Sequence, residues 1–370
     1  MVRIVSFVLI ILSLNTCSQN ANKNAANSSS EILLECEKLI EDHKYSSAYE
    51  MLCESKEDEY ILAKKIQILL ENSKENYRFH YFIIVDSYFS IDENKKMIVF
   101  DIIKEINRYQ RKNGISGILQ LYAGHYYHKL YIYSREYKEA IMDEDDINEK
   151  MFDSYSIAIS MGYSDHDLCR NYADLNFRMG NYDMSIEYYK QAIAFDKSSD
   201  IDYQRLAEVY YKNNEYEKSI ETVNDYLSQN HVYSYLLFYY YRILVYNYIK
   251  LKDYDKLYEY INKAEQIERA SYGLFSLKNF AFLSIGEFEK SKEEAKKYVY
   301  YIYEHISAYY ESEKEHNKER YLNEQIDTLA YFFENYKSYN DQLNELINEL
   351  LLEYSNNELM LEVIKKSNGI

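Results

Sequence analysis

Apolar and polar residues alternate along most of this chain with a helical period, and short turn signals interrupt the pattern at regular intervals. Four segments align on small residues, a turn and an aromatic residue. The turn aromatics are Tyr182, Tyr216, Tyr254 and Phe288, which follow one another at intervals of 34, 38 and 34 residues. Self-similarity at such a period predicts helical hairpins that stack on one another.

The composition favours the same fold class. None of the 370 residues is proline and only 8 are glycine, so an all-β sandwich or barrel would lack nearly all of its turn chemistry. A chain with so few helix breakers is expected to be mostly helical. The formal net charge of −18 argues against a nucleic-acid partner, which needs a clustered basic surface.

The N-terminus has the pattern of an export signal. Arg3 is a lone charge, residues 4–14 are almost entirely apolar, and Cys17 follows closely. An apolar run of that length suits a signal peptide and is too short to span a bilayer. The segment resembles a bacterial lipoprotein signal, although the two residues before Cys17 are not the small ones usual in that family. The alternative is an ordinary signal peptide followed by a chance cysteine.

The lipoprotein resemblance implies how the chain is anchored. Residues 1–16 would be removed as the signal peptide, and Cys17 would carry the lipid. Residues 17–30 are small and polar, and we expect them to form a flexible tether. The protein would then be lipid-anchored to a membrane of the bacterial cell envelope and would face the periplasm or the exterior. No later apolar run predicts a membrane-spanning helix.

The best repeat copy covers residues 166–199. It has Ala173 and Ser185 where two helices approach closely, and Gly180 precedes the turn aromatic Tyr182. The pattern resembles the tetratricopeptide repeat, a helix–turn–helix unit, although the proline that usually ends each repeat is missing. The resemblance implies an all-α, tetratricopeptide-like helical-hairpin solenoid that winds as a right-handed superhelix. Further core positions of the three best copies are Tyr189, Ala192, Leu206, Ala207, Tyr210, Ser219, Val223, Leu244, Tyr248, Ile261 and Ala264.

The repeat pattern sets the expected organisation of the chain. Residues 31–120 read as degenerate N-terminal helical repeats, in which Tyr45 marks a faint turn and Cys36 takes a small-residue position. Tetratricopeptide repeats are expected over residues 121–305. Residues 306–370 are expected to form C-terminal helices and a cap.

We find no sequence motif for catalysis, and we expect neither enzymatic activity nor a cofactor. The Gly-rich phosphate loops, the nucleophile elbow and the zinc-protease motif do not occur. His125 and His128 can share a helix face, but the spacing places no further metal ligand, so a structural or surface role is favoured and no metal is expected. The acidic run 143–146 lacks the glycine of a calcium loop and is expected to be a solvated loop that interrupts a helix. The cysteines other than Cys17 are expected to be small buried residues.

The tetratricopeptide resemblance also implies a binding face. In that family, five positions of each first helix, called helix A, line a concave groove that binds proteins or peptides. Acids at two of these positions break the basic clamp that binds chaperone tails, so a partner with an acidic C-terminal tail is not favoured. The alternative is an ordinary surface in a groove filled by the chain's own C-terminal helices. The groove residues predicted in the three best copies are Arg170, Asp174, Phe177, Arg178, Gln204, Glu208, Tyr211, Lys212, Arg242, Tyr246, Ile249 and Lys250.

The leading functional hypothesis is a lipid-anchored, non-enzymatic scaffold for protein–protein interaction in the bacterial cell envelope. Its partner would be a protein or peptide that the sequence does not identify. The second hypothesis is a glycan- or peptidoglycan-associated envelope protein that assists an enzyme, since tyrosine runs such as 239–241 could stack on sugars. An enzyme that uses scattered acids is a third, weaker hypothesis.

Overall fold

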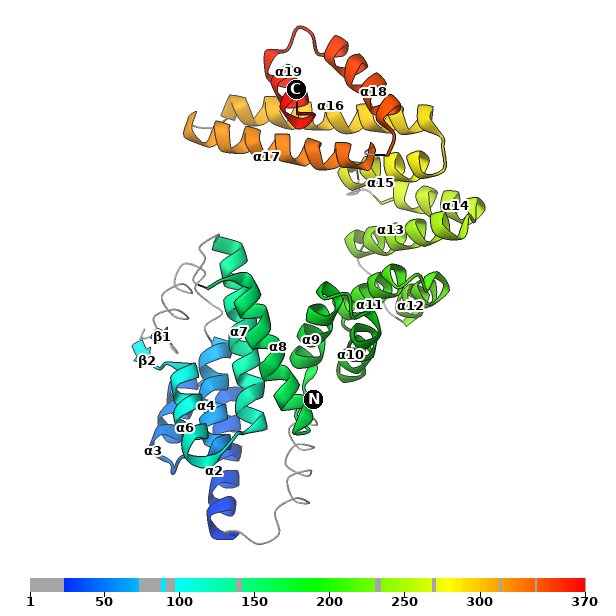
Figure 1. The fold of residues 1–370 in the computed structure, drawn as a ribbon. Coiled ribbons are helices and arrows are strands. Elements are labelled where there is room, and N and C mark those ends of the chain that lie inside the picture. Colours follow the sequence, from blue (N-terminus) through cyan, green and yellow to red (C-terminus); the bar gives the residue numbers. More distant parts are fainter. Residues whose placement is uncertain are drawn as a thin grey trace. The chain divides into compact units, whose positions relative to one another are not determined.

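The computed structural model describes residues 23–72, 88–90, 97–137, 142–229, 234–267, 271–312, 315–336 and 338–369. The predicted signal peptide and Cys17 lie outside these residues. Nearly all of the described chain is helical (Figure 1), which confirms the all-α fold class. The chain divides into two compact units, unit 1 (Met1–Asp202) and unit 2 (Tyr203–Ile370). None of the described helices is long and apolar enough to cross a membrane.

Unit 1 contains helical hairpins and one small β-ribbon. Its described elements are α2 (Lys23–Glu41), α3 (Tyr45–Glu54), α4 (Glu59–Asn72), β1 (Tyr88–Ser90), β2 (Met97–Val99), α6 (Ile102–Asn113), α7 (Gly117–Tyr137), α8 (Glu144–Ser160), α9 (His166–Arg178) and α10 (Tyr182–Phe195). The strands pair antiparallel, with Phe89 opposite Ile98. This ribbon corrects the prediction of helical repeats throughout residues 31–120, because its aromatic and β-branched residues favour a strand over a helix.

Unit 2 is entirely helical in its described residues. Its elements are the greater part of α11 (Asp200–Lys212), then α12 (Tyr216–Gln229), α13 (Ser234–Leu251), α14 (Tyr254–Glu265), α15 (Ser271–Ser284), α16 (Phe288–Ser312), α17 (Glu315–Phe333), the 3-10 turn η2 (Glu334–Tyr336), α18 (Asn340–Glu353) and α19 (Glu358–Ser367). Helices α16–α19 share a core in which Tyr298 stacks on Phe332 with ring centroids 4.2 Å apart. Residues 306–370, where C-terminal helices are expected, hold the end of α16 and the helices α17, α18 and α19.

The hairpin turns follow one backbone pattern. Helices α3, α10, α12, α14 and α16 each begin at the aromatic residue that the sequence marks as a turn position. The amide of Asn181 donates to the carbonyl of Asn176 at 2.8 Å, a bond that closes a helix C-terminus, and the other turns repeat it. The register of these hairpins, including the faint one at Tyr45, is therefore as predicted. The residue two positions before each aromatic has a φ between 58° and 82°: His43, Gly180, Asn214, Lys252 and Gly286.

Small residues lie where the helices approach most closely. Ser219 is fully buried, and its hydroxyl donates to the carbonyl of Ala207 at 2.7 Å. Tyr254 and Phe288, by contrast, are 44% and 36% exposed, and each is the first residue of its helix. The predicted small core residues with no exposure are Ala173, Ser185, Ala192, Ala207, Ser219 and Ala264.

Helix α2 begins earlier than the predicted tether allows. Its first residue is Lys23, so residues 23–30 are helical, and the rest of the tether lies outside the described residues. The segment contains two alanines, which favour the helix, and the Ser29 hydroxyl donates to Asp58 at 2.6 Å. The expected flexible tether is corrected over these residues.

The acidic run after α7 starts a helix instead of forming a loop. Asp143 caps α8, and its carboxylate accepts from the amide of Asp145 at 2.9 Å. Glu144, Asp145 and Asp146 occupy the first turn, where carboxylates interact favourably with the positive end of the helix dipole. The predicted solvated loop is therefore wrong.

The cysteine prediction holds for two of the three described residues. Cys36 and Cys169 are fully buried, whereas Cys53 is exposed, and all three thiols are free. Cys53 lies in the last turn of α3, where Leu52 takes the inward position. The expectation of burial is corrected for Cys53.

Candidate partner-binding surfaces

The predicted groove residues fall on helices α9, α11 and α13. Each is at least partly accessible: Arg178, Lys212 and Lys250 are exposed, and the other nine are half-buried. Four of the twelve belong to unit 1 and eight to unit 2. We call the first set the α9 surface (Arg170, Asp174, Phe177 and Arg178) and the second the α13 surface (Gln204, Glu208, Tyr211, Lys212, Arg242, Tyr246, Ile249 and Lys250).

On the α9 surface, Arg170 is engaged inside the chain. Its Nε donates to Oδ1 of Asp202 at 2.6 Å and its Nη2 donates to Ser199 Oγ at 3.0 Å. Nε2 of His166 lies 2.6 Å from Oδ2 of Asp202, a side chain with no exposure. The repeat pattern did not reveal this cluster, because Asp202 belongs to α11, two helices after α9, and pairs with Arg170 only in the folded chain.

In this cluster, both the His166 ring and the Asp202 carboxyl are stabilised in their charged forms. Hydrogen bonds to Asp167 and Asp202 raise the pKa of His166 to about 9, so the ring is protonated at neutral pH. Burial opposes ionisation of Asp202, but hydrogen bonds from His166 and Arg170 outweigh it and lower the pKa of this carboxyl. Asp202 is therefore an anion held between two cations.

The other residues of the α9 surface are arranged differently. The hydroxyl of Tyr189 donates to Asp174. The guanidinium carbon of Arg178 lies 4.4 Å from the ring centroid of Tyr131 on α7, a cation–π geometry. The ring centroid of Phe177 lies 5.9 Å from that of Tyr182. Arg178 and Phe177 are thus the members of this surface that present a cation and a ring on the accessible side.

The two histidines of α7 have internal roles. Nδ1 of His125 lies 3.0 Å from the hydroxyl of Tyr155, and Nε2 lies 3.0 Å from Oδ2 of Asp165. Burial and the neighbouring His125 lower the pKa of His128 to about 4, so that ring is neutral at pH 7. Within the described ranges, no group of three or more His, Cys, Asp or Glu residues could hold a metal ion.

Aromatic rings from three successive helix-A elements line up on the α13 surface. The ring centroid of Tyr246 on α13 lies 6.2 Å from that of Tyr211 on α11 and 5.0 Å from that of Phe280 on α15. Tyr331 on α17 is 80% exposed and acts electrostatically on the Tyr246 hydroxyl. The sequence analysis missed Phe280, although it lies 34 residues after Tyr246 and therefore at the same repeat position.

Cations flank this row of rings. The guanidinium carbon of Arg242 lies 5.2 Å from the ring centroid of Tyr239. Lys212 and Lys250 stand near the C-terminal ends of α11 and α13. Over the part of the chain that the structure describes, none of Lys212, Arg242 and Lys250 forms an ion pair. The acid on this surface, Glu208, is engaged by Arg205 at 2.9 Å.

The C-terminal helices do not use the α13 surface as their core. Their shared core contains none of the eight residues of that surface among its buried and partly buried members. Ile249 packs instead against the core around Val245 and Leu257. The C-terminal helices therefore do not build their core on this surface, although Tyr331 of α17 lies close enough to contribute, after burial, to the raised pKa of Tyr246.

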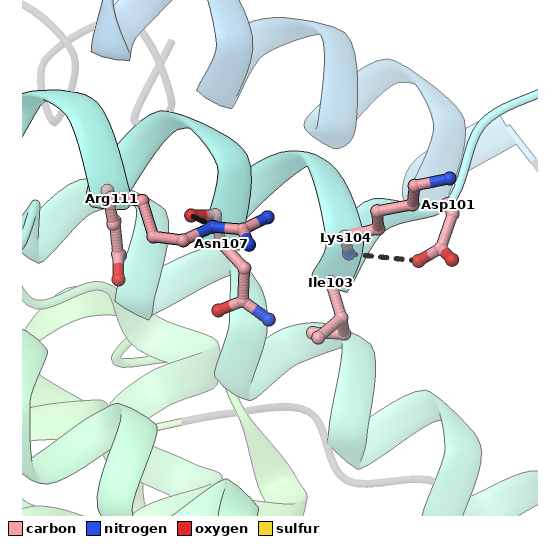
Figure 2. Close-up of a pocket in the computed structure, with 6 residues that line it drawn as sticks. Asp101, Ile103, Lys104, Asn107 and Arg111 are labelled. Atoms are coloured by element: carbon pink, nitrogen blue, oxygen red, sulfur yellow. Dashed lines mark hydrogen bonds between the residues drawn. The ribbon is translucent and has the colours of Figure 1, made fainter.

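A depression on α6 lies apart from both surfaces in the sequence. It has a volume of about 730 Å³ and is lined by one helix and its cap (Figure 2). The amide of Lys104 donates to Asp101 at 3.0 Å, and Nε of Arg111 donates to the carbonyl of Asn107 at 3.2 Å. These polar groups bond to the backbone or the cap of the helix itself.

No protein-family model matches this chain, and no curated protein matches it. Among solved structures, a tetratricopeptide repeat protein from Parabacteroides merdae is 12% identical, with a TM-score of 0.44 over 72% of this chain and 93% of its own. The C-terminal part of a repeat protein from Cytophaga hutchinsonii is also 12% identical, with a TM-score of 0.42 over 78% and 99%. PilF of Pseudomonas aeruginosa is 13% identical, with a TM-score of 0.39 over 66% and 96%. These values are too low to carry a functional inference.

Proposed function

We propose that this chain is a non-enzymatic scaffold that binds a protein or peptide partner on its helix-A faces. The supporting observation is the contrast between two sets of positions on the same hairpins. The small residues that hold the helices together have no exposure, whereas all twelve predicted groove residues are accessible. The accessible set contains arginine and tyrosine, which most often anchor protein interfaces.

We further propose that the chain is held at a membrane of the bacterial cell envelope by lipid on Cys17, with its folded part facing the periplasm or the exterior. The support is the apolar run that ends just before Cys17. A scaffold at this place would bring its partner close to the membrane surface.

Crosslinking in intact cells, followed by capture from detergent-solubilised envelopes, tests the binding face. Tyr211→Ala and Arg178→Glu should each lose a stoichiometric protein that the wild type captures, while Glu187→Lys, an exposed change on α10, should retain it. All variants must first melt like the wild type. Retention of the partner by both groove variants, or enrichment only on cell-wall sacculi, would contradict the proposal.

A further inference from the structure

The α13 surface is basic in a chain that is strongly acidic. Helices α13 and α15 contain Arg242, Lys250 and Lys278 but not one Asp or Glu, although the whole chain has 61 acids and a net charge of −18. Lys278 is already paired with Glu265 and with Glu294. The charges that remain open to a partner on these two helices are therefore positive.

The open cations and the rings alternate across the surface. Lys212 directly follows Tyr211 on α11, and Arg242 and Lys250 lie one helical turn before and one turn after Tyr246 on α13. The Tyr246, Tyr211 and Phe280 rings form the row between them. Such a surface complements a chain in which carboxylates are interspersed with large apolar side chains.

We propose that the α13 surface binds an extended, internal segment of a partner protein in which Asp or Glu residues are interspersed with aromatic or aliphatic ones. This inference rests on the proposed function and names the chemistry of the partner. The carboxylates pair with Lys212, Arg242 and Lys250, and the apolar side chains pack on the row of rings. Positive potential at the surface also speeds the encounter with an acidic partner.

A single-stranded nucleic acid also combines negative charge with flat rings, but it fits this surface less well. Its backbone carries a charge at every nucleotide, and its binding depends on a positively charged groove that follows this backbone. Here the open cations are few and the chain around them is acidic, as the 61 acids and 43 bases show. An acidic peptide with spaced carboxylates matches the surface more closely.

Selection from a peptide library tests the inference. Random segments of about 12 residues, displayed inside a carrier loop so that no terminal carboxylate is present, are selected on the full chain in dilute salt, where charge pairing is strongest. We expect the binders to be enriched in Asp or Glu together with Phe, Tyr or Leu. The best binder is then synthesised and its affinity measured for matched variants.

The variant K212Q/R242Q/K250Q removes the three open cations and should weaken that affinity about tenfold or more, with the loss shrinking as salt is added. The matched control K218Q/K256Q/K290Q removes three exposed lysines from the first turns of α12, α14 and α16, and should stay within about twofold of wild type. Both triple variants change the net charge equally, so a difference in affinity between them depends only on where the removed cations lie.

Each other result overturns the inference. Binders that are neutral or basic, and that lose affinity with Tyr211→Ala but not with K212Q/R242Q/K250Q, would overturn the acidic partner and leave the proposed function standing. If the affinity of the binders changes with neither Tyr211→Ala nor K212Q/R242Q/K250Q, the α13 surface is not the binding site in either proposal. Tighter binding of an oligothymidine probe than of any peptide would assign the surface to nucleic acid. Recovery of no binder would also overturn the inference, while envelope crosslinking still tests the proposed function.

Discussion

Asp202 shows how a single buried charge is stabilised in this chain. A carboxylate with no exposure must gain from its partners what it loses in hydration. Arg170 and His166 supply these partners, and the side chain of each remains 26% exposed. Arg170 therefore holds α9 to the first turn of α11, which limits its freedom to contact a partner protein.

Asp202→Ala should lower the stability of the chain. Removing one partner of a fully buried ion pair costs roughly 3–5 kcal/mol, and we expect about 2 kcal/mol here because both cations keep contact with water. The matched control is Asp153→Ala, which removes an exposed carboxylate from the middle of α8 and should cost little. Thermal melting followed by circular dichroism measures both, and equal melting temperatures for the two variants would contradict this account.

Two histidines should make stability depend on pH in opposite directions. The pKa of His166 is raised from 6.5 to about 9 in the fold, so its contribution is complete below pH 6.5 and is lost as the pH rises towards 9. The pKa of His128 is lowered to about 4, so its contribution is present above pH 6.5 and is lost as the pH falls towards 4.

Melting temperatures of the wild type, His166→Gln and His128→Gln, measured between pH 4 and pH 9, check this prediction. The difference between wild type and His166→Gln should shrink from pH 6.5 to 9. The difference between wild type and His128→Gln should shrink from pH 6.5 to 4. Differences that stay constant over these ranges would show that neither ring is coupled to folding.

At the scale of the element, the hairpin turn repeats in both units with different residues. Gly180 and Gly286 adopt positive φ without a steric cost, whereas Lys252 adopts φ 58° at the equivalent place. A side chain with a Cβ is strained in this left-handed region. The same turn therefore forms both with glycine and with a residue that carries a Cβ, and the backbone of the latter is strained.

Exchanging residues at two equivalent turns tests this interpretation. Lys252→Gly should stabilise the chain by up to about 1 kcal/mol because it relieves the strained backbone. Gly286→Ala should destabilise it by about 1 kcal/mol through backbone strain alone, since an added Cβ would meet no atom within 4 Å. Opposite shifts in melting temperature are expected, and shifts of the same sign would count against a shared turn.

The close contact between paired helices is the second feature at this scale. Ala192→Arg should cost about 3 kcal/mol or more, because it forces bulk and a charge into a position with no exposure. Ala194→Arg on the same helix is the matched control, since Ala194 is exposed and should tolerate the change. Neighbouring hairpins support one another, so the loss should spread beyond α10. A melting temperature for Ala192→Arg close to that of Ala194→Arg would mean that the assigned register is wrong.

At the scale of the whole molecule, the remaining prediction concerns attachment to the membrane. Cys17→Ala should abolish incorporation of labelled fatty acid and move the protein from the membrane fraction to the soluble fraction. The control is Cys53→Ala, which removes an exposed thiol from the folded part and should change neither readout. Acyl label that remains after the change at Cys17, or none in the wild type, would refute the anchor.

Local features were readable from the sequence because they depend on nearby residues. The turn aromatics marked the first residue of α3, α10, α12, α14 and α16 correctly, since helix starts and turns are determined by residues close in the chain. The small residues at close helix contacts were identified for the same reason. Of the candidate site, the tetratricopeptide resemblance indicated twelve positions, and each of them is at least partly accessible in the structure.

Other features were decided only by the tertiary structure. The pairing of Arg170 with Asp202 joins different helices, so no local spacing predicts it. The sequence by itself therefore determined the helices, their turns and their buried faces, because these follow from short-range sterics and the helical period. The tertiary structure decided which charges are paired and which remain open on the α13 surface, because electrostatic pairing depends on distances that only the packed chain defines.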